Sequence, residues 1–154
     1  FTLLEVLVAL IIVAFGMGAL MATLAGKFSD KHGPRLGILV GASLVFLSFV
    51  AMLLLPNSIV MIVIGAVVFD LGAQMSLVSN QSLIYALEPA ARSQINALFV
   101  TAIFIAFALG SFISVRLFEV GGWVAVMGLC AISSALAAVM GLVKYRAGWT
   151  SAII

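Results

Sequence analysis

The chain has 154 residues, of which 66% are hydrophobic and 8% are charged, and its formal net charge is +2. Soluble domains contain about 25% charged residues, so this composition excludes an ordinary water-soluble domain and indicates a membrane protein. The seven lysines and arginines are scattered along the chain and form no continuous basic patch, which excludes nucleic acid as a partner.

The apolar runs are long enough to cross a membrane as helices. A bilayer core about 30 Å thick needs roughly 20 apolar residues per helix. The runs lie at residues 2–26, 35–55, 58–87, 92–118 and 122–145. They are apolar on all sides, whereas the strands of a membrane barrel alternate polar and apolar residues. The sequence therefore predicts an all-α membrane protein, a bundle of about five transmembrane helices in the lipid bilayer.

Basic residues between these spans indicate the orientation. If the spans alternate in direction, six of the seven cations fall on one side of the membrane, and only Arg116 falls on the other. The six are Lys27, Lys31, Arg35, Arg92, Lys144 and Arg146. Loops rich in lysine and arginine stay in the cytoplasm, so we expect a periplasmic N-terminus and a cytoplasmic C-terminus.

Small residues recur at helical spacing in three of the spans. They are Gly18, Ala22 and Gly26 in the first, Gly37 and Gly41 in the second, and Ala106, Gly110 and Ser114 in the fourth. Small side chains allow the backbones of two membrane helices to come close. The spacing therefore predicts close helix contacts at these positions.

The charged segment from Gly26 to Arg35 separates the first two spans and is predicted to form a loop. Glycine permits a tight turn, Pro34 suits the first turn of a helix, and Asp30 can pair with nearby cations. The pattern resembles the cytoplasmic signature loop of the major facilitator superfamily. The matching residues are Gly26, Asp30, Lys31, Gly33 and Arg35. The resemblance implies a gating loop whose charges form a network with a neighbouring helix end.

A second, longer resemblance begins at Asp70 and continues to Asn96. The stretches 70–74, 79–82 and 85–96 look like the tenth-to-eleventh helix region of bacterial transporters of the drug/proton-antiporter type. The resemblance implies that residues 16–146 form helices eight to twelve of a transporter, a partial major facilitator fold in a bacterial inner membrane. It also adds Arg92 to the cytoplasmic gating residues.

Polar residues within the third span are candidates for a substrate or proton pathway. Asp70 lies twelve residues from Ser58, or about 18 Å along a helix, which is near the middle of the bilayer. Gln74 and Gln81 share its side of the helix. An acid at this depth is costly and should face protein or a cavity, where it either exchanges a proton or makes a neutral hydrogen bond. Asn80, closer to the cytoplasm, fits substrate contact or helix–helix hydrogen bonding.

The first ten residues resemble a different family, the type IV pilins and pseudopilins. Phe1 and Glu5 match the start of a mature pilin, in which the glutamate neutralises the N-terminus of the neighbouring subunit. That resemblance implies a cytoplasmic N-terminus, opposite to the orientation given by the cations. The start is either a chance match or a join between unrelated sequences. We therefore distinguish residues 1–15, the transporter bundle 16–146, and a short tail, 147–154.

Taken together, the resemblances imply a fragment of a proton-coupled secondary transporter. It would export a small organic solute or drug by alternating access, and would need the missing N-terminal half or self-association to work. We expect no enzyme activity, and because the chain has one cysteine and one histidine, no metal site and no cofactor. The alternatives are a pilin-like structural subunit or a membrane scaffold that does not transport.

Overall fold

The computed structural model describes residues 2–146, and its description leaves out the side chains of residues 10, 11 and 13–17. The elements are α1 (Leu3–His32), α2 (Pro34–Leu54), α3 (Ile59–Leu87), the short 3-10 helix η1 (Pro89–Ala91) and α4 (Arg92–Arg146). The described residues form helices and connecting turns without a strand. The predicted all-α class is confirmed.

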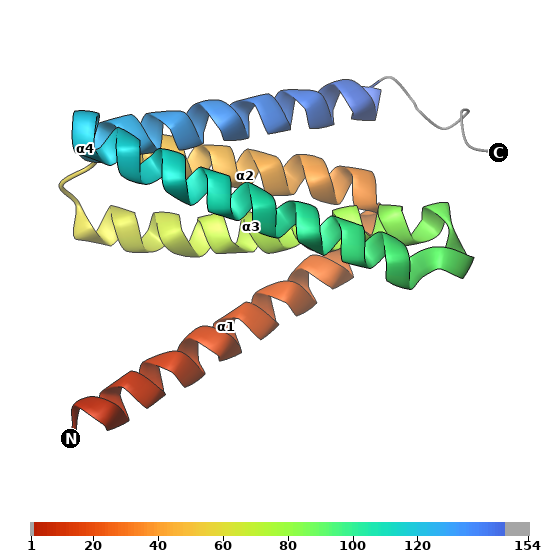
Figure 1. Ribbon diagram of the computed structural model, residues 1–154, viewed down its shortest axis with the longest axis horizontal. Coiled ribbons are helices and arrows are strands. Elements are labelled where there is room, and N and C mark those ends of the chain that lie inside the picture. Colours follow the sequence, from red (N-terminus) through yellow and green to blue (C-terminus); the bar gives the residue numbers. More distant parts are fainter. Residues whose placement is uncertain (1, 147–154) are drawn as a thin grey trace.

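α4 consists of two helices that meet at Gly122. This residue has φ 62° and ψ −154°, a backbone conformation outside the helical region. The second half of α4 therefore folds back alongside the bundle (Figure 1). The break agrees with the predicted boundary between the fourth and fifth spans.

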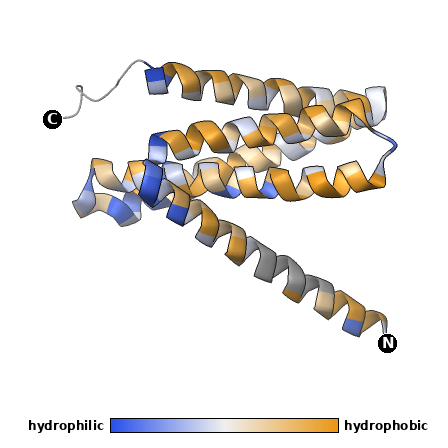
Figure 2. Cartoon of the chain, turned by 180° about the vertical axis from the view of Figure 1, so that it is seen from behind, coloured by the Kyte–Doolittle hydropathy of each residue, from blue (hydrophilic) through white to orange (hydrophobic). Residues whose placement is uncertain are grey.

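The helices of the bundle run in alternating directions, so their connections gather at two ends (Figure 1). Residues 27–35, 88–92 and 144–146 lie at one end, which we call the cation-rich end. Residues 54–58 and 116–122 lie at the opposite end. Figure 2 shows polar residues concentrated at these ends and apolar residues between them. The six cations assigned to one side from the sequence therefore do share one end of the molecule.

Within the described residues, three helical segments are long and apolar enough to cross a membrane. They are Pro34–Leu54, Ile59–Leu87 and Pro89–Arg146. The last segment is broken at Gly122, so each of its halves can make one crossing. Large apolar side chains such as Leu98, Phe104 and Phe107 are exposed on the outside, as expected where lipid replaces water as solvent.

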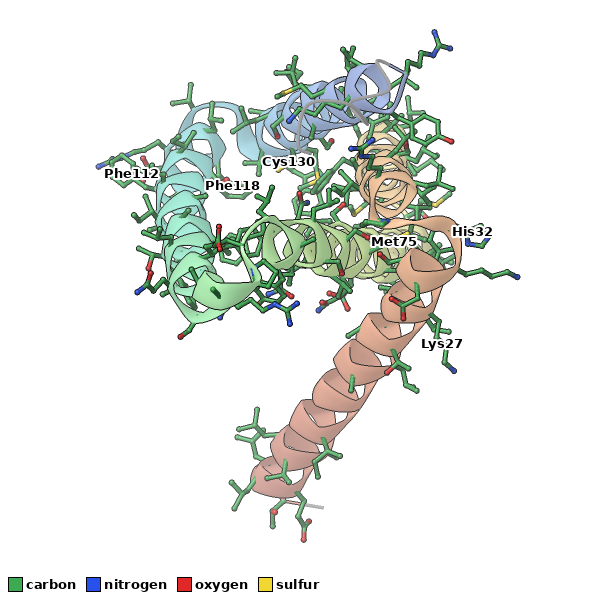
Figure 3. The ribbon with its side chains drawn as sticks, turned by 90° about the vertical axis from the view of Figure 1, so that its right-hand side faces the viewer. Lys27, His32, Met75, Phe112, Phe118 and Cys130 are labelled. Carbon is green, nitrogen blue, oxygen red and sulfur yellow. The ribbon has the colours of Figure 1, made fainter. Side chains whose placement is uncertain are left out.

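α1 differs from the prediction because it continues through most of the charged segment. The expected loop between Gly26 and Arg35 is helical up to His32, and Gly33 alone separates α1 from α2. α1 leaves the bundle at an angle, and its last turns lie against α2 and α3 (Figures 1 and 3). Ala25 and Ser29 are buried there. The helix is continuous across residues 15 and 16, where the sequence suggested a change of character.

α2 and α3 make the closest helix contact, and glycine makes it possible. A Cβ on Gly41 would lie 2.6 Å from the Gly72 carbonyl oxygen, and one on Gly72 would lie 2.7 Å from the Gly41 carbonyl oxygen. A Cβ on Gly37 would overlap the side chain of Ser79. The predicted close contact is thus confirmed for α2. At Gly18, Gly26 and Gly110 an added Cβ would meet nothing within 4 Å, so these glycines make no such close contact within the described part of the chain.

Candidate functional site

Three polar side chains of α3, those of Asp70, Gln74 and Gln81, lie on the face that points away from α2. Gly72 lies at the contact with α2. Because a helix turns about 100° per residue, Asp70 and Gln74 lie about 160° around the helix from Gly72, and Gln81 lies about 180° from it. All three side chains are partly buried. The stripe predicted from the sequence is therefore a real face of α3, opposite its glycine-lined face.

Asp70 is the acidic member of this polar face. It lies eleven residues from the start of α3 at Ile59 and seventeen from its end at Leu87, so it sits in the interior of a helix about 43 Å long. Among the described residues it has no hydrogen-bond or ion partner. The structure thus places a carboxyl group in the interior of a helix long and apolar enough to cross a membrane, without a partner from the described helices.

The polar face meets α4 at the cation-rich end. The Tyr85 hydroxyl donates a hydrogen bond to Oδ1 of Asn96 at 2.6 Å, and Nε of Arg92 donates to the Tyr85 carbonyl oxygen at 3.3 Å. These bonds close the turn through η1. Arg92, a predicted gating residue, therefore satisfies a carbonyl at the end of α3, which is a structural contact.

Asn80 lies apart from the polar face and lines a cavity of about 350 Å³ at the cation-rich end. Its side-chain amide donates to the Ser76 carbonyl oxygen one turn earlier, at 2.8 Å. Arg35 from α2 and Lys144 and Tyr145 from α4 line the same cavity. The structure therefore groups Asn80 with Arg35, a residue of the predicted gating loop, and separates it from Asp70.

The remaining residues of the predicted gating loop surround the end of α1. Lys31 and Asp30 are exposed, and Asp30 makes no ion pair with another described residue. Gly33 has φ +87° and donates its N–H to the Ser29 carbonyl oxygen at 2.8 Å, which ends the helix. Gly33 thus has the turn-forming role expected of it, while Gly26 is helical.

Comparison with known proteins decides the family. The sequence pattern described as Major Facilitator Superfamily matches residues 2–150. The chain belongs to the major facilitator superfamily. The YgaY transporters of Escherichia coli strain K12 and of Escherichia coli O157:H7, whose names call them uncharacterized, are each 35% identical to it over 122 residues. That stretch is 79% of this chain and 30% of each relative. No solved structure matches the chain.

As a major facilitator protein, the chain spans less than a third of the curated relatives it matches. The matched family region begins at residue 2 and so includes most of the segment that resembles a pilin. Phe1 lies outside the described residues. The Glu5 carboxylate accepts a hydrogen bond from the Thr2 N–H at 2.8 Å, and the Glu5 N–H donates to the Thr2 hydroxyl at 3.3 Å. This reciprocal pair is a capping box that begins α1.

Two serines of this facilitator segment contact α2: Ser79, which the sequence suggested for helix–helix hydrogen bonding or substrate contact, and Ser76, which was not singled out from the sequence. The hydroxyls of Ser76 and Ser79 are buried against α2 and have no hydrogen-bond partner in the described chain. The signal in the sequence that could have indicated this contact is spacing. Ser76 and Ser79 are three residues apart on one span, and Gly37 and Gly41 are four residues apart on the other. Small residues at such spacing on two spans indicate the faces that meet.

Proposed function

We propose that this chain is the C-terminal part, helices eight to twelve, of a proton-coupled major facilitator transporter that exports a small organic solute or drug. The observation that supports the proposal is Asp70. It is a partly buried acid in the interior of α3, on the polar face that points away from α2, and it has no partner among the described residues. Acids within membrane spans are rare and costly, and they mark ion and proton pathways.

The polar face of α3 explains how solute and proton could share one pathway. A carboxyl group that is neutral in one state of the transporter and charged in the other carries one proton per cycle. Gln74, one turn along on the same face, offers both a donor and an acceptor to a polar solute. Gln81 extends this face towards the cation-rich end, which we assign to the cytoplasm.

Alternating access requires two helix bundles that rock around a central site. The relatives are more than three times as long as the matched segment, and in this chain the polar face of α3 points away from its closest partner helix. We therefore propose that the missing transporter half, or a second copy of the chain, completes the pathway. The 154-residue chain by itself should not transport.

The test is Asp70→Asn in a full-length transporter that contains this segment. Asparagine has nearly the same size as aspartate, but its side-chain amide cannot take up and release a proton as a carboxyl group does. Ethidium serves as the probe, because its fluorescence reports export from energised cells. We expect export against the ethidium gradient to fall to the level of cells without the transporter, whereas exchange of ethidium across the membrane without a proton gradient persists.

Glu119→Gln is the matched control for this experiment. Glu119 is an exposed acid at the opposite end, where it pairs with Arg116 at 3.3 Å. Its neutralisation removes the same charge outside the proposed pathway and should leave export unchanged. Uphill export that survives Asp70→Asn would contradict proton coupling through this residue. Loss of both export and exchange would instead assign Asp70 to solute binding or folding.

A further inference from the structure

The cavity at the cation-rich end has a chemistry that the transport pathway does not use. It lies between α2, α3 and the second half of α4, and the polar residues of its described lining are Arg35, Asn80, Lys144 and Tyr145. Its volume of about 350 Å³ is at the lower end of the range for small-molecule sites. On α3, Asn80 points to a different side of the helix from the stripe that contains Asp70.

The lining combines positive, polar and apolar side chains. Two of its residues, Arg35 and Lys144, are cations, and none of the described residues that form it is an aspartate or a glutamate. The nearest acid along α3 is Glu88, an exposed residue that follows the end of the helix. Leu83 and Ile84 supply part of the apolar wall. A ligand that matches this surface has an anionic group beside the cations and a hydrocarbon part against the wall.

The cavity lies at the ends of helices, and this position favours one class of ligand. Leu87, Leu142 and Val143, at the same ends of α3 and α4, are exposed apolar residues on helices that can cross the membrane. Acyl chains can lie along such surfaces while a headgroup stays at the interface. Basic pockets between membrane helices on the cytoplasmic side bind anionic lipid headgroups. We propose that this cavity is a binding site for the headgroup of an anionic phospholipid.

Lipid retention by the purified full chain tests this site. The chain is extracted in a mild detergent, mixed with phosphatidylglycerol or with zwitterionic phosphatidylcholine, and the bound lipid is counted by native mass spectrometry. We expect phosphatidylglycerol to be retained in preference to phosphatidylcholine. A basic residue near anionic lipid is worth roughly fivefold in affinity, so the double exchange Arg35→Gln with Lys144→Gln should weaken retention by about thirtyfold.

The matched control removes two cations at the same end of the molecule. Lys27 and Lys31 are exposed on α1 and do not line the cavity, so Lys27→Gln with Lys31→Gln should leave retention unchanged. Ile84→Trp keeps both cations but fills the space, and it should also release the lipid. Helix content by circular dichroism verifies that each variant is folded, and Lys144→Gln alone replaces the double exchange of Arg35 and Lys144 if that variant is not.

Several results would overturn the proposal. Equal loss in the Lys27 and Lys31 control would mean that the lipid follows overall charge and has no defined site. Equal retention of phosphatidylcholine would mean that the cavity recognises only hydrocarbon. Displacement by inorganic phosphate at the same concentration as the lipid would mean that the cations bind a free anion. None of these results depends on transport, so the lipid site is tested independently of the proposed proton pathway.

Discussion

At the scale of single residues, the contact between α2 and α3 leaves no room for a side chain at its centre. Gly41 and Gly72 face each other with their backbones in near contact, and the Ser76 and Ser79 side chains lie against Gly41 and Gly37. In lipid, helices associate through close packing because hydrocarbon around them is as apolar as their own side chains. The glycines therefore stabilise the bundle by permitting contact.

Gly41→Ala should loosen this contact. The added methyl group would lie 2.6 Å from the Gly72 carbonyl oxygen and 2.8 Å from the Ser76 nitrogen, both backbone atoms that cannot turn aside. Overpacking of this kind costs about 1–3 kcal/mol. Thermal unfolding of the purified chain in detergent, followed by circular dichroism, should show the lower stability.

Gly110→Ala is the control for this substitution. Gly110 is also helical, but an added Cβ there would meet nothing within 4 Å. Alanine forms helices better than glycine by about 1 kcal/mol, so this variant should be as stable as the original chain or slightly more stable. If both variants lose stability equally, the tight packing of α2 on α3 is contradicted.

At the scale of the elements, the sequence predicted the bounds of α2 and α3 better than the end of α1. The spans 35–55 and 58–87 agree with α2 and α3 within a residue or two, because the change from apolar to polar residues coincides with Pro34 and Ser58. α1 continues beyond its apolar run because residues 27–32 contain no glycine or proline. Lys31 and His32 also suit the negative end of its dipole. Hydrophobicity marks the edge of the lipid, and helices extend past it.

The fold of α4 depends on one glycine, at Gly122. With φ 62° and ψ −154°, it occupies a region open essentially to glycine alone, where another residue costs about 1–3 kcal/mol. Gly122→Ala should therefore weaken the return of the second half of α4 to the bundle. We expect lower stability by this amount, together with a broader distance distribution between spin labels at Ser93 and Val143, two exposed positions on α4.

Gly128→Ala tests whether the effect belongs to the bend. Gly128 lies in the second half of the same helix, and an added Cβ would meet nothing there within 4 Å. Both spin-labelled variants are made in a Cys130→Ser background. The Gly128→Ala variant should keep the narrow distance distribution. A broad distribution in both variants, or in neither, would mean that Gly122 does not determine the bend.

At the scale of the whole molecule, the candidate site was only partly readable from the sequence. Periodicity was sufficient to place Asp70, Gln74 and Gln81 on one face, because a regular helix fixes their relative directions. Periodicity could not show that Asn80 shares a cavity with Lys144, since that depends on how α4 folds back from Gly122. Contacts within a helix follow from spacing, whereas contacts between distant helices follow from the bundle.

Two signals in the chain give opposite orientations, and the arrangement of the helices makes them testable together. The cations favour a cytoplasmic location for the end of α1, whereas the pilin resemblance favours one for its beginning. α1 is continuous from Leu3 to His32, so its two ends must lie on opposite sides if it crosses the membrane. Only one of the two signals can therefore determine the orientation of α1 in the membrane.

Cysteine labelling in a bacterial inner membrane decides between them. In a Cys130→Ser background, single cysteines replace His32, Asn57, Ala90 or Val120, all exposed at the ends of helices. A maleimide that cannot cross the membrane should label the substituted Asn57 and Val120 positions in intact spheroplasts, and the other two only after lysis, because cation-rich loops are retained in the cytoplasm. The reverse pattern would show that the N-terminal signal governs insertion. Labelling of all four from outside would contradict the alternating bundle itself.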